Sequence, residues 1–379
     1  MDFNLTQEQT QFADALRRWV EKDYNFEQRK HIITSAAGVS ADAWNALTEL
    51  GATALPIPEQ QGGFSGTAID MLVIMQELGR GLVIEPYFAT VLGAEFLKQA
   101  GGHDEMLEQV ASGELKLATA LTEKQSRHDL FDIATSASKN AEGYVLNGVK
   151  TIVLHGAQAD QLIVSARTQG AQRDTAGISL FVLDAKAAGI SRRDYRTIDG
   201  FRAADITFNQ VQVAASALLG TADTGWNTID AVSDYGITLL CAEAIGVMEA
   251  IFAATLDYLK TRQQFGVPIG KFQVLQHRMA EMFMEMEQAR SMATLAAVKV
   301  SSTDAEERRR TVSAAKARIG QAARFIGQQA VQLHGGMGVT NELPAAHMFK
   351  RLTMIELSLG DTDHHLARFV AQPGFKQAA

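Results

Sequence analysis

The hydrophobic period of this 379-residue chain changes twice, and these changes limit its fold more than any other feature. Up to about residue 115, apolar residues recur at helical spacing, starting with Phe12, Leu16 and Trp19 behind a capping box of Thr6 and Gln9. Strand patterns then extend to about residue 220, and helical spacing returns afterwards. The pattern predicts an α+β protein with an N-terminal helical domain (1–115), a middle β domain (116–225) and a C-terminal helical bundle (226–379).

The middle segment has the pattern of an antiparallel sheet. YVLNGVKTIVL places Asn147 and Gly148 between two apolar runs, which is the typical sequence of a two-residue hairpin turn. Short connections rich in Gly and Asp separate the further strand patterns QLIVSA, GISLFVL and ADITFNQVQV. We therefore predict antiparallel pairing, with a hairpin at Asn147–Gly148.

Three long helical runs follow the β segment. The first closes near Gly266, the second covers residues 272–300, and the third starts at a capping box of Thr303 and Glu306 and ends at Gly335. The first run is apolar nearly all round and rich in small residues, among them Ala242, Ala244, Gly246 and Ala250. Small residues let helices approach closely, so we predict a four-helix bundle with this run at its centre.

Composition excludes several classes of protein. A net charge of −8 and a sequence pI of about 5.6 give no general attraction to nucleic acid or to anionic lipid. The one cysteine, Cys241, excludes a disulfide within the chain. The N-terminus lacks the pattern of a signal peptide, and we find no uncharged stretch long enough to span a bilayer. We expect a cytoplasmic protein without a nucleic-acid or membrane partner.

Residues 355–366, IELSLGDTDHHL, raise the question of a metal site. Asp361, Asp363, His364 and His365 are residue types that bind metals. In a helix, however, neighbouring side chains point about 100° apart and cannot all face one ion. We favour a helix N-terminus, whose dipole acidic residues complement, and predict no metal. There is also no GxGxxG after a strand, and GVPIGKF lacks the Ser or Thr of a phosphate loop.

Five segments, together with the order of the predicted domains, resemble the acyl-CoA dehydrogenase family over the whole chain. The segments are PEQQGGFSG, ALTEKQSR, NGVKTIVLHGAQAD, TRQQFGVPIGKFQ and VQLHGGMGVTNE. The resemblance implies FAD held between the β domain and the bundle, with the bundle of a second subunit closing over the cofactor. The cofactor-binding positions it implies are Leu121, Thr122, Arg262, Phe265, Gln273, Gln332, Gly335 and Gly336.

The residue types at these positions suit a flavin cofactor. Leu121 and Thr122 offer backbone and hydroxyl groups to the polar edge of the ring, and Arg262 offers a charged fork to the pyrophosphate. The chain departs from the family at Ile152 and Leu154, where an aromatic residue and a threonine are usual, and in QSRHD, which replaces a Gly-Ser-Asp segment.

The substrate side lacks the catalytic glutamate of the family. Leu359 occupies its usual position and Gly236 the alternative one, and neither side chain accepts a proton. The Leu359 N–H is still expected to polarise a thioester carbonyl. Asp234 matches a substrate-side position, whereas Ile237 replaces the family's arginine.

Three explanations of the missing base remain open. Glu243, two helical turns beyond Gly236, is a candidate displaced base, and Glu356 is a weaker one. Alternatively, the Gly-Asp-x-Asp-His-His ending resembles small subunits of heteromeric pimeloyl-CoA or sterol side-chain dehydrogenases, which implies a catalytic homologue as partner. The third explanation is an inactive structural or regulatory subunit that binds flavin or acyl-CoA, or has lost the flavin.

We predict FAD-dependent dehydrogenation of an acyl-CoA to a trans-2-enoyl-CoA in fatty acid or sterol degradation. Electrons are expected to pass to an electron-transfer flavoprotein. The expected assembly is a homo- or heterotetramer.

Overall fold

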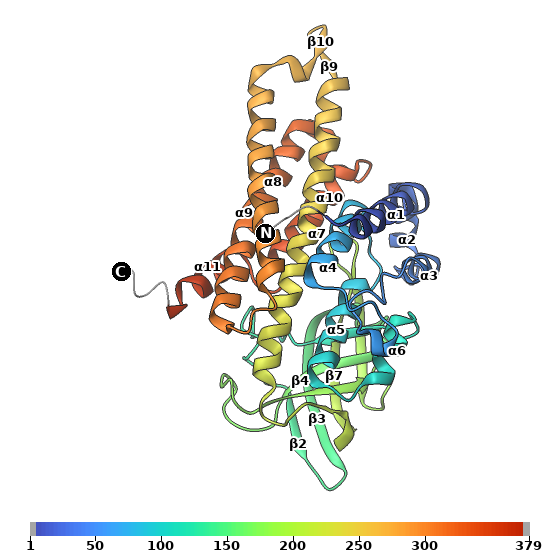
Figure 1. Ribbon diagram of the computed structural model, residues 1–379, viewed down its shortest axis with the longest axis vertical. Helices are drawn as coiled ribbons and strands as arrows, with labels where there is room; N and C mark the ends of the chain where they lie inside the picture. The colour runs from blue at the N-terminus through green and yellow to red at the C-terminus, as the bar shows by residue number, and fades with distance from the viewer. Residues whose placement is uncertain (1–4, 374–379) are drawn as a thin grey trace. The chain divides into compact units, whose positions relative to one another are not determined.

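The computed structural model describes residues 5–373, which divide into two compact units. The first contains the chain up to His31, Thr67–Val83 and the chain from Ile237 onward; the second contains Ile32–Gly66 and Ile84–Gly236. Helical, β and helical segments follow one another as predicted (Figure 1), so the α+β class is confirmed. The division by packing does not test the domain boundaries at residues 115 and 225, which stay predictions.

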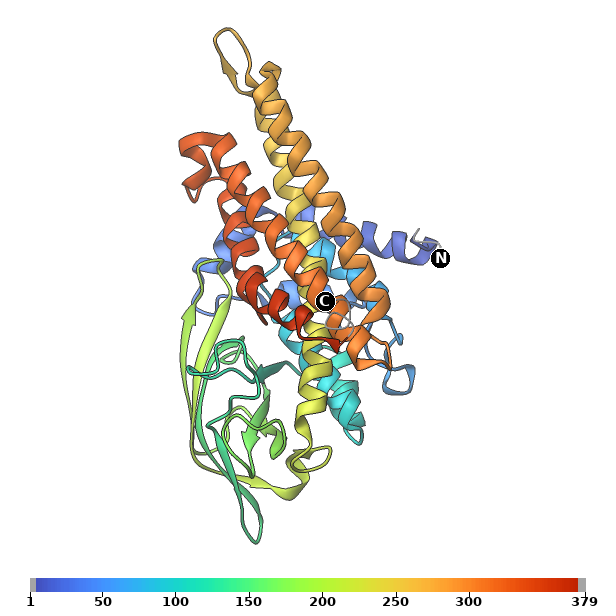
Figure 2. The same cartoon turned by 90° about the vertical axis from the view of Figure 1, so that its left-hand side faces the viewer.

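The first unit is helical. Long stretches of α7, α8 and α9 run alongside one another (Figure 2). Thr6 and Gln9 form the predicted capping box of α1, and Thr67 and Asp70 form another at α4. The helices that contribute to this unit are α1 (Gln7–Asp23), α2 (Phe26–Thr34), α4 (Ala68–Arg80), α7 (Gly225–Thr261), α8 (Gln273–Lys299), α9 (Ala305–His334), α10 (Pro344–Leu357) and α11 (Thr362–Val370).

Helices α4 and α7 cross in close contact, as the small residues of α7 predict. A Cβ atom added to Gly246 would lie 1.8 Å from the carbonyl oxygen of Gln76. A Cβ atom on Gly79 would lie 2.2 Å from the carbonyl oxygen of Glu243. Backbone therefore touches backbone at this crossing, and only glycine fits at either position.

Two predicted helix ends are wrong in detail. Helix α7 ends at Thr261, and a small hairpin of β9 (Gln263–Gln264) and β10 (Val267–Pro268) leads through η3 (Ile269–Lys271) to α8. Helix α9 is capped by Asp304, whose side chain accepts from the N–H groups of residues 306 and 307. Asp is as good an N-cap as Thr, so the helix starts one residue later than the Thr303 pattern indicated.

The second unit is built on a sheet. Within residues 5–373, eight strands pair in the order β6-β7-β3-β2-β4-β5-β8, with β1 beside β4. Most pairs are antiparallel, as predicted; β1 and β2 each pair with β4 in parallel. The strands are β1 (Leu117–Ala120), β2 (Ser136–Lys139), β3 (Gly143–Leu154), β4 (Gln161–Arg167), β5 (Ile178–Asp184), β6 (Ile190–Arg196), β7 (Arg202–Ala214) and β8 (Leu218–Leu219). The short helical elements α3 (Ala41–Glu49), η1 (Glu59–Gln61), α5 (Tyr87–Ala100), α6 (Asp104–Ala111) and η2 (Ala215–Ala217) complete this unit.

The predicted hairpin at Asn147–Gly148 is wrong. Strand β3 runs through both residues, and the turn to β2 lies at residues 140–143. The register against β7 shifts between Leu146 and Gly148, which marks a β-bulge. A Cβ atom on Gly148 would lie 2.4 Å from the Thr135 hydroxyl oxygen. This glycine therefore serves a bulge and a close approach rather than a turn.

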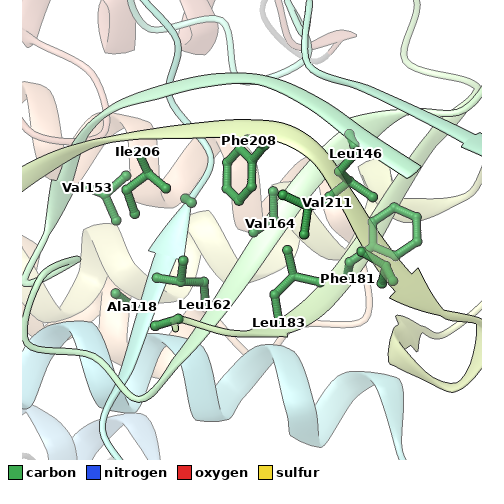
Figure 3. Close-up of a cluster of buried hydrophobic side chains, with 14 of the residues drawn as sticks. Ala118, Leu146, Val153, Leu162, Val164, Phe181, Leu183, Ile206, Phe208 and Val211 are labelled. Carbon is green, nitrogen blue, oxygen red and sulfur yellow. The ribbon is translucent and has the colours of Figure 1, made fainter. Parts of the chain in front are cut away.

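A cluster of buried apolar side chains from the sheet forms the core of the second unit (Figure 3). Removing such side chains from water is the main force that stabilises a sheet of this kind. Its members include Leu146 on β3, Leu162 and Val164 on β4, Phe181 and Leu183 on β5, and Ile206, Phe208 and Val211 on β7. The core fixes β3 and β4, which carry the polar network of the candidate site.

Helix α7 is long and apolar enough to cross a membrane by length and composition when a few charged residues are allowed. However, 72% of its most apolar window is buried inside the protein. The core helix of a bundle has the same composition, so this finding is weak support for a membrane span.

Candidate active site

Two hydrogen bonds fasten the end of β1 to β3 in the second unit. The Thr122 hydroxyl donates to the Thr151 carbonyl oxygen at 2.5 Å, and the Thr151 N–H donates to the Thr122 carbonyl oxygen at 2.9 Å. Leu121 is buried beside them. Because its proton is engaged, the Thr122 oxygen offers lone pairs to a further donor.

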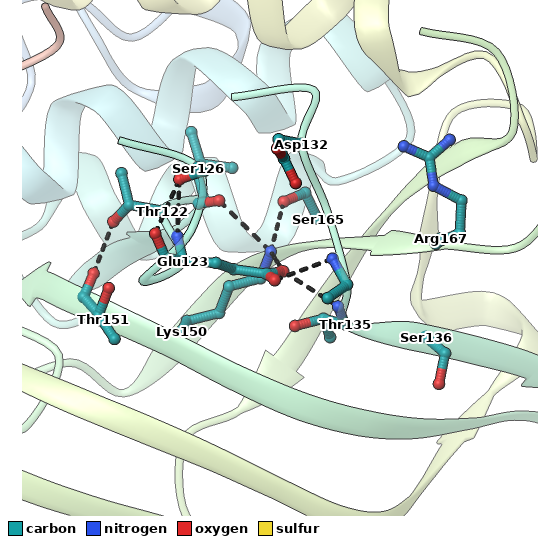
Figure 4. A network of polar contacts seen from close by, with 12 residues as sticks. Thr122, Glu123, Ser126, Asp132, Thr135, Ser136, Lys150, Thr151, Ser165 and Arg167 are labelled. Atoms are coloured by element: carbon teal, nitrogen blue, oxygen red, sulfur yellow. Dashed lines mark hydrogen bonds and ion pairs between the residues drawn. The ribbon is translucent and has the colours of Figure 1, made fainter. Parts of the chain in front are cut away.

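A buried ion pair that is not evident from the sequence supports this segment (Figure 4). Lys150 Nζ lies 2.8 Å from Glu123 Oε1, 3.0 Å from Ser165 Oγ and 3.3 Å from the Leu121 carbonyl oxygen. The Glu123 carboxylate also accepts from the N–H groups of residues 134 and 135. The pair therefore holds the loop after Thr122 against β3 and β4.

Burial and charge oppose each other in this pair. Burial disfavours both charges, but the Lys150 ammonium and the hydrogen bonds outweigh it and lower the pKa of Glu123 to about 2. Burial lowers the pKa of Lys150 to about 8, although Glu123 acts in the opposite direction. Both groups are charged at neutral pH. The signal in the sequence is Lys150 itself, an isolated charge in the apolar strand pattern around Asn147 and Gly148.

The same strand presents an apolar side chain to solvent. Ile152 is 57% exposed and has a φ of 54°, and its N–H donates to Asp205 Oδ1 at 3.2 Å. Leu154 is half-buried. An exposed isoleucine on a rigid strand is suited to contact the face of a planar ring.

In the first unit, the predicted cofactor residues around the β9–β10 hairpin are all exposed. Arg262 and Gln273 flank the hairpin, and Phe265 forms its turn with a φ of 54°. Phe265 is 90% exposed and touches Phe272 edge to face, with ring centroids 6.1 Å apart. The structure therefore gathers a guanidinium group, an amide and an aromatic ring at one end of the α7–α8 pair.

The end of α9 is also open. Gly335 is its C-cap with a φ of 62°, and a Cβ atom on Gly335 or Gly336 would meet nothing within 4 Å. Gln332 is exposed one turn earlier. The rings of Tyr258 on α7 and His334 on α9 pack together with their centroids 4.6 Å apart. This contact brings the ends of α7 and α9 together.

Glu243, the candidate displaced base, is engaged in an ion pair. Both of its oxygens accept from Arg351 of α10, each at 2.6 Å, and both side chains are buried. Such a two-point contact stabilises the carboxylate and directs both oxygens at the guanidinium. Arg351 gave no signal in the sequence, because the two residues are far apart along the chain. A catalytic role of Glu243 stays a prediction.

The weaker candidate, Glu356, also has partners. Its Oε1 atom accepts from the Thr362 N–H at 3.1 Å, the Thr362 hydroxyl at 2.9 Å and Arg324 at 3.1 Å. Glu356 therefore braces the start of α11. Asp234 and Ile237 are buried on α7, and the substrate-binding role of Asp234 stays a prediction.

The segment 355–366 contains the start of helix α11, as predicted. Asp361 caps α11 by accepting from the His364 N–H at 2.8 Å. Across the described part of the chain, no group of three or more His, Cys, Asp or Glu side chains is arranged to hold a metal ion. Leu359 lies in the loop just before the cap, with a φ of 54° and a half-buried side chain.

A helical, a β and a helical segment in this order form the fold of one class of flavin-dependent oxidoreductases. Family models of the N-terminal, middle and C-terminal domains of acyl-CoA dehydrogenases match residues 6–114, 118–211 and 223–372. The chain therefore belongs to the acyl-CoA dehydrogenase family, whose members are oxidoreductases acting on acyl-CoA.

Individual relatives agree over nearly the whole length. The chain is 29% identical to the probable acyl-CoA dehydrogenase YngJ of Bacillus subtilis (strain 168), over 96% of this chain and 97% of that protein. It resembles the FAD complex of PigA with a TM-score of 0.90 and 25% identity, over 99% and 100% of the two chains. It resembles a variant of the Tcur3481-Tcur3483 steroid ACAD with a TM-score of 0.87 and 26% identity, over 98% and 99%.

FAD is the cofactor of this chain, and the residues fit it. In the second unit, the exposed Ile152 offers apolar surface to a ring system, and Thr122 offers lone pairs to a polar edge. In the first unit, the exposed Phe265 offers an aromatic face. The exposed Arg262 suits a pyrophosphate. The open space over Gly335 and Gly336 allows a cofactor to approach the backbone. The assignment of each residue to a contact stays a prediction.

Proposed function

We propose that this chain binds FAD and an acyl-CoA thioester and acts as one subunit of a hetero-oligomer that forms a trans-2-enoyl-CoA. A homologous subunit supplies the carboxylate base, and an electron-transfer flavoprotein receives the electrons. The observation that carries the proposal is the state of the carboxylates: Leu359 stands at the base position, and Glu243 and Glu356 are both engaged in buried contacts.

A base must reach the α proton with a free lone pair. Glu243 would have to leave Arg351, which would remove the carboxylate that pairs with a buried guanidinium, at a cost in free energy. Glu356 would have to release the first turn of α11. The related steroid ACAD, Tcur3481-Tcur3483, combines two proteins. This likeness supports an assembly of two kinds of chain.

The chain's own contribution is to bind and orient. When bound, FAD supplies the hydride acceptor. The Glu123–Lys150 pair keeps the Thr122 segment fixed beside β3. In the proposal, the Leu359 N–H donates to the thioester carbonyl, where negative charge develops when the α proton leaves. These groups lower the barrier only if another chain removes the proton.

An anaerobic titration tests the proposal. The purified chain is mixed with acyl-CoA thioesters of increasing chain length while the flavin absorption band is followed. We expect bound flavin whose spectrum shifts on addition of ligand but does not bleach, because binding needs no base whereas reduction does. Bleaching by the chain alone would show that it has its own base.

A colourless purified chain that does not take up added FAD would instead support a flavin-free structural subunit. The informative second arm adds the homologous subunit that co-purifies with the chain. Bleaching that needs both chains supports the hetero-oligomer.

A further inference from the structure

The loop that joins α10 to α11, residues 358–361, holds its backbone in an unusual conformation. Leu359 has a φ of 54° and Gly360 a φ of 108°. Leucine rarely adopts the left-handed region, and such a residue persists only where its surroundings hold it there. Buried polar groups from α9 and α11 surround this loop.

Lys316 of α9 joins the two ends of the loop. Its side chain is fully buried, and Nζ donates to the Glu356 carbonyl oxygen at 2.8 Å and to the Gly360 carbonyl oxygen at 2.7 Å. Burial lowers the pKa of Lys316 to about 8, against the opposing effects of Cys241, Glu356 and Asp361. The group therefore stays mainly cationic at neutral pH, and its position is costly unless both carbonyls are bound.

His365 of α11 holds the middle of the loop. Its Nε2 lies 2.9 Å from the Leu359 carbonyl oxygen, and its Nδ1 lies 3.4 Å from Ser313 Oγ. A carbonyl only accepts, so Nε2 carries the proton and Nδ1 accepts from the serine hydroxyl. Burial, together with the nearby Lys316 charge, lowers the pKa of His365 to about 2, which agrees with this neutral form.

The three carbonyl groups at residues 356, 359 and 360 are thus each bound by a buried donor. The Ser358 N–H donates to the Met354 carbonyl oxygen at 3.0 Å, which fixes the chain on the other side of Leu359. With the backbone held on both sides, the direction of the Leu359 N–H is fixed as well.

We propose that Lys316 and His365 are positioning residues that hold the Leu359 N–H in the orientation that binds the thioester carbonyl. The inference rests on the proposed function, because the role of the Leu359 N–H comes from the family. It adds the reason why a loop without its glutamate keeps a strained backbone: the strain serves to bind the substrate rather than to remove a proton.

The test compares ligands with and without the carbonyl. The probes are butyryl-CoA and palmitoyl-CoA, each beside its thioether counterpart, butyl-CoA and hexadecyl-CoA, with Kd measured by calorimetry on the flavin-loaded chain. We expect the wild-type chain to bind a thioester about three- to tenfold more tightly than the matching thioether, as one neutral hydrogen bond would give.

His365→Leu and Lys316→Met remove the donors and should bring this ratio close to one while the thioether Kd stays unchanged. His365→Gln keeps a donor at similar reach and should restore the ratio. The matched control, His364→Leu, removes the neighbouring imidazole and should leave the ratio as in the wild-type chain. Circular dichroism and Tm show whether each variant folds. If Lys316→Met does not fold, the comparison of His365→Leu with His365→Gln still tests the proposal.

Folded variants that keep the wild-type ratio would overturn the proposal. A wild-type chain that binds thioester and thioether equally would also overturn it, while leaving acyl-CoA binding intact. A wild-type chain that binds none of the four ligands would contradict the proposed function itself, and the positioning role with it.

Discussion

At the scale of single residues, two buried ion pairs bear on the candidate active site. Lys150 is fully buried with Glu123, and Arg351 is buried with Glu243. A buried pair is weak support for stability by itself, but the loss of one partner leaves an uncompensated charge. Both pairs hold a segment that bears on function: the first supports the Thr122 loop, and the second fixes the candidate base.

The Glu123–Lys150 pair should make the free energy of unfolding decrease at acidic pH. The pKa of Glu123 falls from 4.5 to about 2 on folding, so its contribution is fully present above pH 4.5 and is lost as the pH falls through about 2. We expect the loss to be about 3 kcal/mol. Urea unfolding at several pH values measures it, with the double variant Glu123→Gln/Lys150→Met as control.

The double variant lacks this titration, so its free energy of unfolding should fall less over the same range. The pKa of Lys150, about 8, lies outside this range and does not interfere. Equal acid dependence in the two proteins would contradict the prediction.

Glu243→Gln separates the structural role of this residue from a catalytic one. We expect the substitution to lower the free energy of unfolding by about 3 kcal/mol, because it removes the negative charge that pairs with the buried Arg351 guanidinium. Flavin reduction by the assembled enzyme should persist in the molecules that fold. The measurements are urea unfolding and single-turnover flavin reduction.

Glu249→Gln is the matched control. Glu249 also lies on α7 and pairs with Arg80 and Arg290, which are partly exposed, so its loss should cost no more than about 1 kcal/mol. Normal stability with abolished flavin reduction in Glu243→Gln would identify Glu243 as the base.

At the scale of elements, close backbone contacts and a bulge decide how the parts fit. The bulge in β3 changes which side chains face the core: Lys150 points inward, and the neighbouring Val149 is 45% exposed. A shift of one residue exchanges the two faces of a strand. The α4–α7 crossing depends in the same way on Gly79 and Gly246.

Gly246→Ala should disrupt this crossing. The added Cβ atom would lie 1.8 Å from the Gln76 carbonyl oxygen, so α4 and α7 must move apart. We expect a loss of about 1–3 kcal/mol in the free energy of unfolding, as for other overpacked sites. Ala253→Ser, at an exposed position of the same helix, is the control and should change stability by less than about 0.5 kcal/mol. Unchanged stability of Gly246→Ala would show that the crossing is loose.

At the scale of the whole molecule, the proposed dependence on a partner should appear in the assembly. We expect the chain, purified alone, not to form a fully flavinated and active homotetramer. Size-exclusion chromatography with light scattering, followed at the flavin absorption band, measures mass and flavin content together. A stable, active, fully flavinated homotetramer would contradict the hetero-oligomer, and an assembly with a homologous chain that carries a glutamate in place of Leu359 would support it.

The sequence by itself determined the order of helical and β segments, the α1 cap, the tight packing of α7 and the absence of a glutamate at residues 236 and 359. These features depend on the local hydrophobic period, on helix-capping residues and on residue identity, all of which can be read from neighbouring positions in the sequence.

Only the tertiary structure decided that Asn147–Gly148 is a bulge, that Lys150 lies inside, that Glu243 is bound to Arg351 and that Lys316 and His365 hold the Leu359 loop. Each of these depends on groups distant in sequence, such as Thr135 beside Gly148 or Arg351 beside Glu243. The energy of a buried polar group is set by partners that only the folded chain brings within reach.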